Sequence, residues 1–310
     1  MNLQDWRDAP YELLAPVYEA ERQRWLRHLQ WDPAPAWREV EAARTSWGLP
    51  GLLAVDGVGR VRGTAFFVFE QNRLDIGGLT ADHVDATDAL ISGVLAAARS
   101  GQVQVIRTML FDGAVALRSG LTHRGFEVES HLYLSRPLTD RHLTTRTEPS
   151  RPGGSSVEVE ADAWQESDVV PTAALLGRAY DRRSGALFAP GNLPQEWERY
   201  VRNLTGFAAC GTLNAEASRV VREGDAIRAV ALVTEIAPCT AHLVQLAVDP
   251  AMRGHHLGAL LLSDTCTRLA ARGYKSITLL VAEHNAAARS LYDAAGFRHD
   301  ATFLAATLGC

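Results

Sequence analysis

The sequence predicts an α/β protein with two tandem domains of one plan, each a mixed, largely antiparallel twisted sheet flanked by helices. Three observations carry this prediction. The segment 138–156 is polar, contains two prolines and two adjacent glycines, and divides the 310 residues nearly in half, as a linker would. Gly125 and Phe126 return as Gly296 and Phe297, an offset of 296 − 125 = 171. A β-hairpin pattern also lies in each half.

We therefore expect a first domain over residues 1–138, a linker over 139–155 and a second domain over 156–310. A chain of this length is long enough for two domains with separate hydrophobic cores. The same offset places the apolar run Ala89–Ile91 under Leu260–Leu262, so apolar helix positions agree between the halves.

In the first half, helical periodicity predicts two helices, over Tyr11–Leu29 and Ala36–Trp47. A hairpin follows, with strands over Leu52–Val55 and Val61–Phe69 around an Asp-Gly turn. A further strand is expected over Val103–Leu110, where apolar residues recur before the Gly-Phe pair.

The second half repeats this order. Helices are expected over Val169–Arg182 and Gln195–Leu204, and a hairpin over Arg219–Arg222 and Ile227–Ile236. The strand Ser276–Val281 corresponds to Val103–Leu110 of the first half at the common offset.

An anion site is predicted between these elements. An apolar strand pattern from Leu243 to Val248 ends at Asp249-Pro250, and a loop rich in arginine and glycine leads into a helix. The first N–H groups of a helix lack intrahelical partners, and the helix dipole is positive at that end. This geometry suits a pyrophosphate.

The loop runs Arg-Gly-His-His-Leu-Gly over Arg253–Gly258, and a second motif contains Asn285, Tyr292 and the Gly-Phe pair at regular spacing. In this order the motifs resemble the acyl-CoA-binding core of the GCN5-related N-acetyltransferase (GNAT) family, whose loop reads Arg/Gln-x-x-Gly-x-Gly/Ala. The two expected domains would then be GNAT-like. One departure is that His256 stands where the family has its first loop glycine.

The resemblance implies acetyl-CoA as the cofactor, held by the loop N–H groups and by backbone pairing with the strand before the loop. Asn285 would cap the last helix or bond the pantetheine arm. Strands that splay after Val248 and before Ile277 would admit that arm. The residues expected to bind the cofactor are Leu246, Ala247, Val248, Arg253, Gly254, His255, His256, Leu257, Gly258 and Asn285.

For catalysis, the resemblance implies that Tyr292 protonates the departing thiolate, a task that suits a phenol with a pKa near 10. Many relatives use a glutamate as general base on the strand ahead of the loop, but this strand carries Gln245, which cannot take a proton. His242 and Glu235 are the two candidate bases. A neutral amine that loses its proton to water would need neither.

The first half is expected to lack a cofactor site. At the common offset, Arg253, His256 and Gly258 correspond to Asp82, Asp85 and Thr87. Two carboxylates repel a pyrophosphate. The apolar positions persist, so we expect a structural domain without the chemistry.

The function implied is an acetyl-CoA-dependent N-acetyltransferase that acts on a small primary amine by direct transfer in a ternary complex. The alternative is a CoA-binding sensor or scaffold without transferase activity, and a narrower variant is an enzyme similar in architecture to mycothiol synthase. A fragment starting near Gly153 is expected to bind acetyl-CoA but to acetylate poorly. The tryptophans of the first two helices either pack a core or wall an acceptor pocket: Trp25, Trp31, Trp37 and Trp47.

Composition limits the partners. The net charge of −5 argues against nucleic acid. No apolar run approaches the ~20 residues of a membrane span, and the N-terminus lacks a signal-peptide pattern, so we expect a cytoplasmic monomer or homodimer without a membrane partner. Adjacent His255 and His256 lack a third ligand, so no metal is expected. The cysteines show no metal spacing and are expected to be reduced thiols: Cys210, Cys239, Cys266 and Cys310.

Overall fold

The computed structural model divides into two compact units, and each contains segments from both halves of the sequence. Unit 1 comprises Met1–Tyr133, Val281–Asn285 and Asp300–Cys310, and unit 2 comprises Leu134–Leu280 and Ala286–His299. The expected linker over 139–155 lies outside the residues that the structure describes. Those residues are 1–70, 72–138, 160–180, 193–207 and 210–310.

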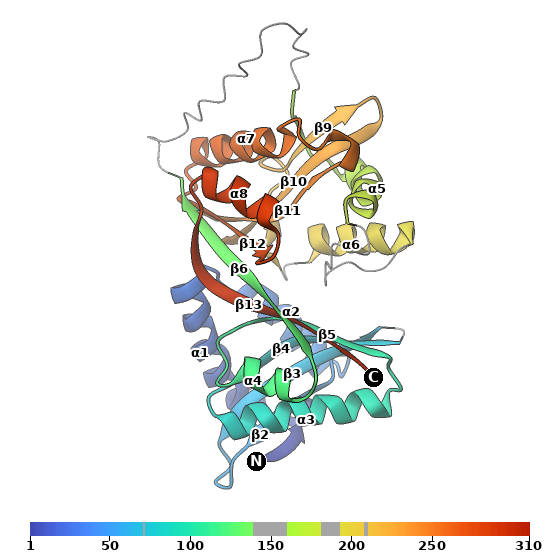
Figure 1. Cartoon of the computed structure of the whole chain (residues 1–310). Helices are drawn as coiled ribbons and strands as arrows, with labels where there is room; N and C mark the ends of the chain where they lie inside the picture. The colour runs from blue at the N-terminus through green and yellow to red at the C-terminus, as the bar shows by residue number, and fades with distance from the viewer. Residues whose placement is uncertain (71, 139–159, 181–192, 208–209) are drawn as a thin grey trace, which may run out of the picture. The chain divides into compact units, whose positions relative to one another are not determined.

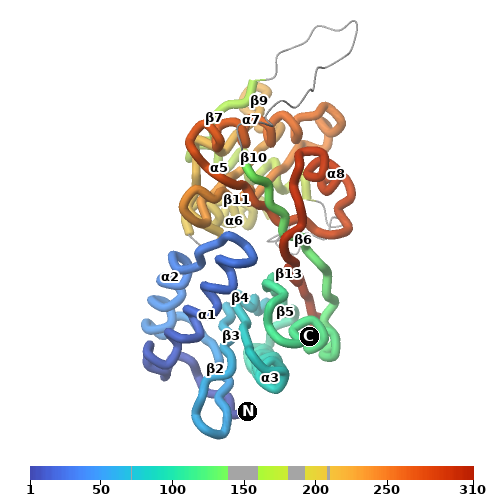
Figure 2. The backbone as a smooth tube through the Cα atoms, turned by 90° about the vertical axis from the view of Figure 1, so that its left-hand side faces the viewer, coloured from blue at the N-terminus to red at the C-terminus, as the bar shows by residue number. Residues whose placement is uncertain are grey.

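Unit 1 is a mixed sheet with helices on both faces. Its strands follow the order β1-β2-β3-β4-β5-β13, in which β4 and β5 are parallel and the other neighbours are antiparallel. Figure 2 shows α1 and α2 on one side of β2–β4 and α3 on the other. The elements are β1 (Asn2–Asp5), η1 (Trp6–Asp8), α1 (Tyr11–Leu29), α2 (Ala34–Thr45), β2 (Gly51–Val55), β3 (Val61–Glu70), β4 (Arg73–Ala81), α3 (Val84–Ser100), β5 (Val105–Phe111), α4 (Leu117–His123), β6 (Glu127–Pro137) and β13 (Arg298–Gly309).

Apolar spacing explains the packing of unit 1. Helix α3 buries Leu90, Ile91 and Val94 at helical spacing, and β5 buries every second residue, as expected for a strand with one face on a core. A second core forms below α1 and α2, where the Trp6 indole donates to the Leu49 carbonyl at 2.8 Å and stacks on Phe66.

Three of the four tryptophans assigned to the first two predicted helices, Trp25, Trp31 and Trp47, differ in how far they are buried in unit 1. Trp31 is buried, and Trp25 packs edge-on against it with ring centroids 5.3 Å apart. Trp47 is exposed under the Arg7 guanidinium. The packing of Trp25 against the buried Trp31 fits a core role for these two residues, whereas the exposed Trp47 does not have one.

Unit 2 repeats the plan, with the strand order β12-β11-β10-β9-β7 and the short β8 paired to β10. Among the described residues of this sheet, β11 and β12 form the only parallel pair of strands. In Figure 1, α7 and the pair α5 and α6 flank this sheet. The elements are β7 (Asp162–Ala163), η2 (Glu166–Asp168), α5 (Val169–Ala179), α6 (Pro194–Gly206), β8 (Thr212–Leu213), β9 (Arg219–Glu223), β10 (Ala226–Ala237), β11 (Thr240–Val248), η4 (Pro250–Met252), α7 (Leu257–Ala271), β12 (Ser276–Ala282) and α8 (Ala286–Ala294).

The internal repeat is present, but one offset does not describe all of it. Strands β5 and β12 are separated by 276 − 105 = 171 residues, whereas the ends of β4 and β11 are separated by 248 − 81 = 167. The difference of four residues arises from the loop before the next helix and from that helix. The loop is two residues long before α3 (82–83) and eight residues long before α7 (249–256), whereas α7, with 15 residues, is two shorter than α3, with 17. Asp82 therefore corresponds to Asp249, and not to Arg253 as the gapless offset predicts. In both cases the Asp N–H donates to an arginine carbonyl of the neighbouring antiparallel strand, Arg62 of β3 or Arg228 of β10.

The units also exchange strands relative to the sequence halves. The last strand, β13, pairs with β5 of unit 1 over seven positions, from Phe303 opposite Phe111 to Gly309 opposite Val105. Conversely, the end of β6, from Leu134 to Pro137, belongs to unit 2, where β6 neighbours β12. A cut at residue 139 or 155 would therefore not separate the two units as they fold.

Candidate functional site

The site with the clearest chemistry is the 249–256 loop of unit 2 and the helix start behind it. Strand β11 ends at Val248, and η4 leads into an exposed stretch from Arg253 to His256. Gly254 has φ +82° and His256 has φ +60°, so the chain turns twice through the left-handed region. These turns place the start of α7 at the end of an exposed loop.

The start of α7 is open to an anion. Its N-cap residue, His256, makes no side-chain hydrogen bond to the helix, so the first N–H groups are not capped by this residue. In unit 1 the equivalent helix α3 is capped, because the His83 imidazole accepts from the Asp85 N–H at 3.2 Å. Of these two equivalent helices, the one in unit 2 combines the long loop, the open N-terminus and the glycine that a pyrophosphate needs.

Asp249 anchors the loop. Its carboxylate is buried, accepts from the Ala251 N–H at 3.1 Å, and contacts Arg178 at 2.9 Å and Arg228 at 3.2 Å. Burial alone would raise the pKa of this carboxyl, but the hydrogen bonds from Ala251, Arg178 and Arg228 together hold the pKa below its usual value. Arg253 fixes the other end, since it donates to the Ala179 carbonyl at the end of α5 at 3.0 Å.

We expect Asp249→Asn to destabilise the protein by about 1–3 kcal/mol at pH 7, because the charge that pairs with two guanidinium groups is lost. A carboxyl whose pKa is lowered by folding stabilises above its unfolded pKa and ceases to do so as pH falls through the folded value. The difference between wild type and Asp249→Asn should therefore shrink below about pH 4. Denaturant unfolding at pH 7 and pH 3.5 measures both values, and an unchanged difference would contradict the assignment.

His256 is the residue that departs from the family glycine, and its backbone already adopts the conformation that glycine favours. A non-glycine residue in this region is disfavoured by about 1–2 kcal/mol, although histidine tolerates it better than most. We expect His256→Gly to leave the loop shape unchanged and to keep or slightly raise the melting temperature. His255→Gly is the matched control, since His255 has no positive φ and the substitution should cost about 0.5–1 kcal/mol. Equal losses in thermal unfolding would show that His256 is not strained.

The strand ahead of the loop is arranged to expose its backbone. Parallel pairing of β11 with β12 is confined to Thr240–Leu243 opposite Ser276–Leu279, although both strands continue beyond it. On its other side, β11 stays paired with β10, where Leu246, Ala247 and Val248 lie opposite Ala231, Val230 and Ala229. The register shifts between Leu232 and Val233, so Val244 is an extra residue that bends β11 here. The divergence begins after Leu243 on β11, which is earlier than the predicted Val248. On β12 it begins after Leu279 and not before Ile277, which pairs with Ala241.

Tyr292 lies in α8 of unit 2 and is 7% exposed. Its ring packs against Phe297 at 5.7 Å. Burial, with a smaller contribution from Tyr180, raises the pKa of the phenol well above its usual value. The hydroxyl therefore keeps its proton at neutral pH, which is the form that a proton donor requires.

A hydrogen-bonded network that the sequence did not predict surrounds Gln245. Tyr180 donates to the amide oxygen at 2.9 Å, and the amide nitrogen donates to the Tyr200 hydroxyl at 2.7 Å. Trp197 stacks on Tyr180 at 5.9 Å and meets Tyr200 edge-on at 5.8 Å. Burial raises the pKa of Tyr180 to about 12, so this group is neutral as well. In the sequence, only the spacing of Trp197 and Tyr200 on an amphipathic helix could have indicated this network.

The two candidate bases lie at the start of β11 and the end of β10. His242 is 5% exposed, and burial lowers its pKa to about 3. Its Nδ1 is hydrogen-bonded to the Thr278 hydroxyl at 2.8 Å, while that hydroxyl donates to the Ala241 carbonyl. Glu235 is exposed and accepts a hydrogen bond from Tyr274. A base works best with a pKa near the working pH, so this environment does not favour His242.

Asn285 immediately precedes α8, and its N–H donates to the Ala282 carbonyl at 3.0 Å. It is grouped with unit 1, whereas the 249–256 loop and Tyr292 belong to unit 2. The role of Asn285 toward the pantetheine arm therefore stays a prediction.

Gly258 begins the first turn of α7. A Cβ at this position would lie 3.4 Å from Leu291 of α8 and 3.7 Å from Val248 of β11. A Cβ there would make ordinary van der Waals contacts, so this packing does not itself require glycine.

One family model matches the part of the chain that contains this strand–loop–helix site. Residues 183–297 match the model of the acetyltransferase (GNAT) family. The chain therefore carries a GNAT acetyltransferase domain, and this domain contains the 249–256 loop and Tyr292.

Solved structures show the tandem arrangement. A GCN5-related N-acetyltransferase from Sphaerobacter thermophilus is 15% identical with a TM-score of 0.61, covering 84% of this chain and 80% of that one. A tandem GNAT protein from the clavulanic acid biosynthesis pathway is 15% identical with a TM-score of 0.57, covering 84% and 82%. A GNAT-family acetyltransferase from Colwellia psychrerythraea is 12% identical with a TM-score of 0.54, covering 99% and 100%. At these identities the likeness shows the fold, which is a tandem GNAT fold. No curated protein sequence matches the chain.

Two further findings concern the described residues alone. None of their helices is both long and apolar enough to cross a membrane. No group of three or more His, Cys, Asp or Glu side chains gathers there in a way that could hold a metal ion.

Proposed function

We propose that the chain is an acetyl-CoA-dependent N-acetyltransferase that transfers the acetyl group directly to a small primary amine in a ternary complex. The observation that carries the proposal is the open start of α7 behind an eight-residue loop, next to a strand edge that β12 leaves unpaired. A pyrophosphate would meet the N–H groups of Leu257 and Gly258, and the pantetheine arm would pair with Leu246–Val248.

Acetyl-CoA supplies a thioester, whose carbonyl carbon accepts the amine nitrogen while the bond to sulfur breaks. In this proposal the backbone N–H near Leu246 polarises the carbonyl oxygen. Tyr292 gives its proton to the leaving sulfur, and its buried ring holds the hydroxyl in place. Holding both reactants in one complex supplies much of the rate.

The amine must lose one proton, and we propose that water removes it. His242 has a low pKa and an occupied Nδ1, and Glu235 lies at an exposed strand end. Gln245, Tyr180 and Tyr200 form an uncharged surface beside β11. A neutral amine meets no charged group in this network and needs no side chain to deprotonate it before attack.

Release of CoA thiol from acetyl-CoA in the presence of amines tests the proposal. The panel should contain alkylamines, arylamines, amino sugars and an aminoacyl amino sugar, with alcohols as controls. We expect release above the hydrolysis rate with at least one amine, together with a product heavier by one acetyl group. Binding of acetyl-CoA without release for any amine would favour a sensor or scaffold. No binding at all would refute the cofactor site.

A further inference from the structure

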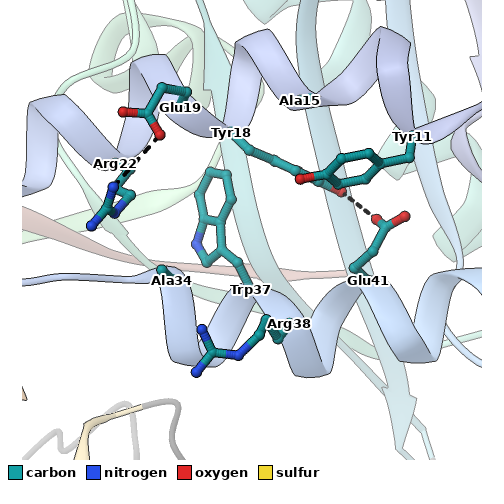
Figure 3. Close-up of a pocket in the computed structure, with 9 residues that line it drawn as sticks. All are labelled: Tyr11, Ala15, Tyr18, Glu19, Arg22, Ala34, Trp37, Arg38 and Glu41. Carbon is teal, nitrogen blue, oxygen red and sulfur yellow. Dashed lines mark hydrogen bonds and ion pairs between the residues drawn. The ribbon is translucent and has the colours of Figure 1, made fainter.

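A pocket of about 350 Å³ opens between α1 and α2 of unit 1 (Figure 3). This unit lacks the long loop and open helix start described above, so the proposed cofactor site gives the pocket no role. Its walls come from one face of each helix, with Tyr11 and Tyr18 on α1 and Trp37 on α2. A volume of this size accommodates a small organic molecule.

The three aromatic side chains form the apolar part of the pocket. The rings of Tyr18 and Trp37 meet edge to face with centroids 4.6 Å apart, and Tyr11 lies 6.4 Å from Tyr18. Tyr11 is 54% exposed, so a large aromatic surface faces water beside the other two rings. Aromatic faces carry negative charge in their quadrupole and attract cations that approach within about 6 Å.

Two carboxylates, Glu19 and Glu41, also line the pocket. Glu41 accepts a hydrogen bond from the Tyr18 hydroxyl at 3.1 Å, and the exposed Glu19 lies on the next turn of α1. Burial is the main cause that raises the pKa of Tyr18 well above its usual value, the charge of Glu41 adds to it, and Arg44 opposes it, so the phenol stays neutral.

The charged groups around the rings are largely paired with one another. Arg22 makes two hydrogen bonds to Asp32, at 2.8 and 2.9 Å, and lies 3.7 Å from Glu19. Glu41 accepts two hydrogen bonds from Arg44, at 2.8 and 2.6 Å, and Arg44 is not among the lining residues. Figure 3 shows the guanidinium of Arg38 directed away from Tyr11 and Tyr18. The ring faces are therefore the groups that offer a ligand its main contact.

We propose that this pocket binds a small organic cation, an alkyl- or quaternary ammonium group, through the faces of Tyr11, Tyr18 and Trp37. Binding requires neither the 249–256 loop nor acetyl-CoA. It is therefore a second ligand site of the chain, whatever the acceptor of the acetyl group proves to be.

Calorimetric titration of the full chain with choline tests the proposal, and 3,3-dimethyl-1-butanol is the matched neutral probe of the same shape. We expect choline to bind at least about fivefold more tightly than the alcohol, because only the cation interacts with the ring quadrupoles. Equal affinities would overturn the proposal and leave an apolar pocket only.

Two variants locate the site. Trp37→Leu and Tyr11→Leu should each weaken choline binding by about 3- to 30-fold, and Tyr18→Phe, which keeps the ring, should change it much less. Tyr11 is largely exposed, so Tyr11→Leu should fold even if Trp37→Leu does not. Trp47→Leu is the control, since it removes an exposed tryptophan of the same unit outside the pocket. Unchanged choline affinity in Tyr11→Leu together with folded Trp37→Leu would overturn the assignment, as would an equal loss in Trp47→Leu.

Discussion

Tyr292→Phe should lower kcat by about 10²–10⁴-fold, the usual contribution of a general acid, and should change acetyl-CoA affinity by less than about twofold. The substitution removes the proton donor and keeps the ring, so the contact with Phe297 at 5.7 Å persists. Because burial raises the pKa of the phenol, the wild-type rate should show no loss from Tyr292 ionisation between pH 6 and about pH 9. Single-turnover kinetics and calorimetry separate the chemical step from binding.

Tyr133→Phe serves as the control for this variant. Tyr133 is buried in unit 1, and its hydroxyl donates to the Leu29 carbonyl at 2.8 Å. The change removes a buried tyrosine hydroxyl outside the GNAT domain, so it should lower stability without lowering kcat. Full turnover in Tyr292→Phe with chemistry rate-limiting would mean that another group, or water, protonates the thiolate.

Cutting the chain within residues 139–159 should leave its two pieces tightly associated. Each piece lacks a strand that its own unit requires. The N-terminal piece lacks β13, whose Phe303 and Leu304 are buried in unit 1, and the C-terminal piece lacks the end of β6, where Leu134 is buried. Each such side chain contributes about 1.5–3 kcal/mol, against a total stability of about 5–15 kcal/mol. Loss of a whole strand is therefore expected to unfold the isolated pieces.

A protease site introduced near Gly153 provides the measurement. After cleavage, the pieces should elute together in a 1:1 ratio and separate only in denaturant. The C-terminal piece expressed alone should be insoluble or unfolded, in contrast to the sequence-based expectation that it binds acetyl-CoA. A folded, monomeric C-terminal piece that binds acetyl-CoA would show that the exchanged strands are dispensable.

Local patterns predicted local elements well. Helix α1 has the bounds that its periodicity indicates, Tyr11–Leu29, and the hairpin strands β2 and β3 lie within one residue of their predicted positions. These features depend on neighbours a few residues apart, so one sequence carries them. The 249–256 loop could also be predicted from the sequence, because a strand, a glycine-containing loop and a helix follow each other directly there.

The strand pairing, the repeat offset and the Gln245 network depend on contacts between residues that are distant in the sequence. Strands β6 and β13 follow the same Gly-Phe pair, so the sequence cannot say which one pairs with β5. The four-residue difference between the repeats is invisible to a gapless offset drawn from the downstream motif. Likewise, Tyr180 and Tyr200 meet at Gln245 only because α5 and α6 pack on β11.

We expect this tandem fold to bind one acetyl-CoA, at the 249–256 loop of unit 2, and none in unit 1. Calorimetric titration of the intact chain with acetyl-CoA measures this number. The stoichiometry should be near one, because α7 alone of the two equivalent helices has an open N-terminus behind a long loop. A stoichiometry near two would mean that unit 1 binds the cofactor despite its two-residue loop and capped helix, and would contradict this expectation.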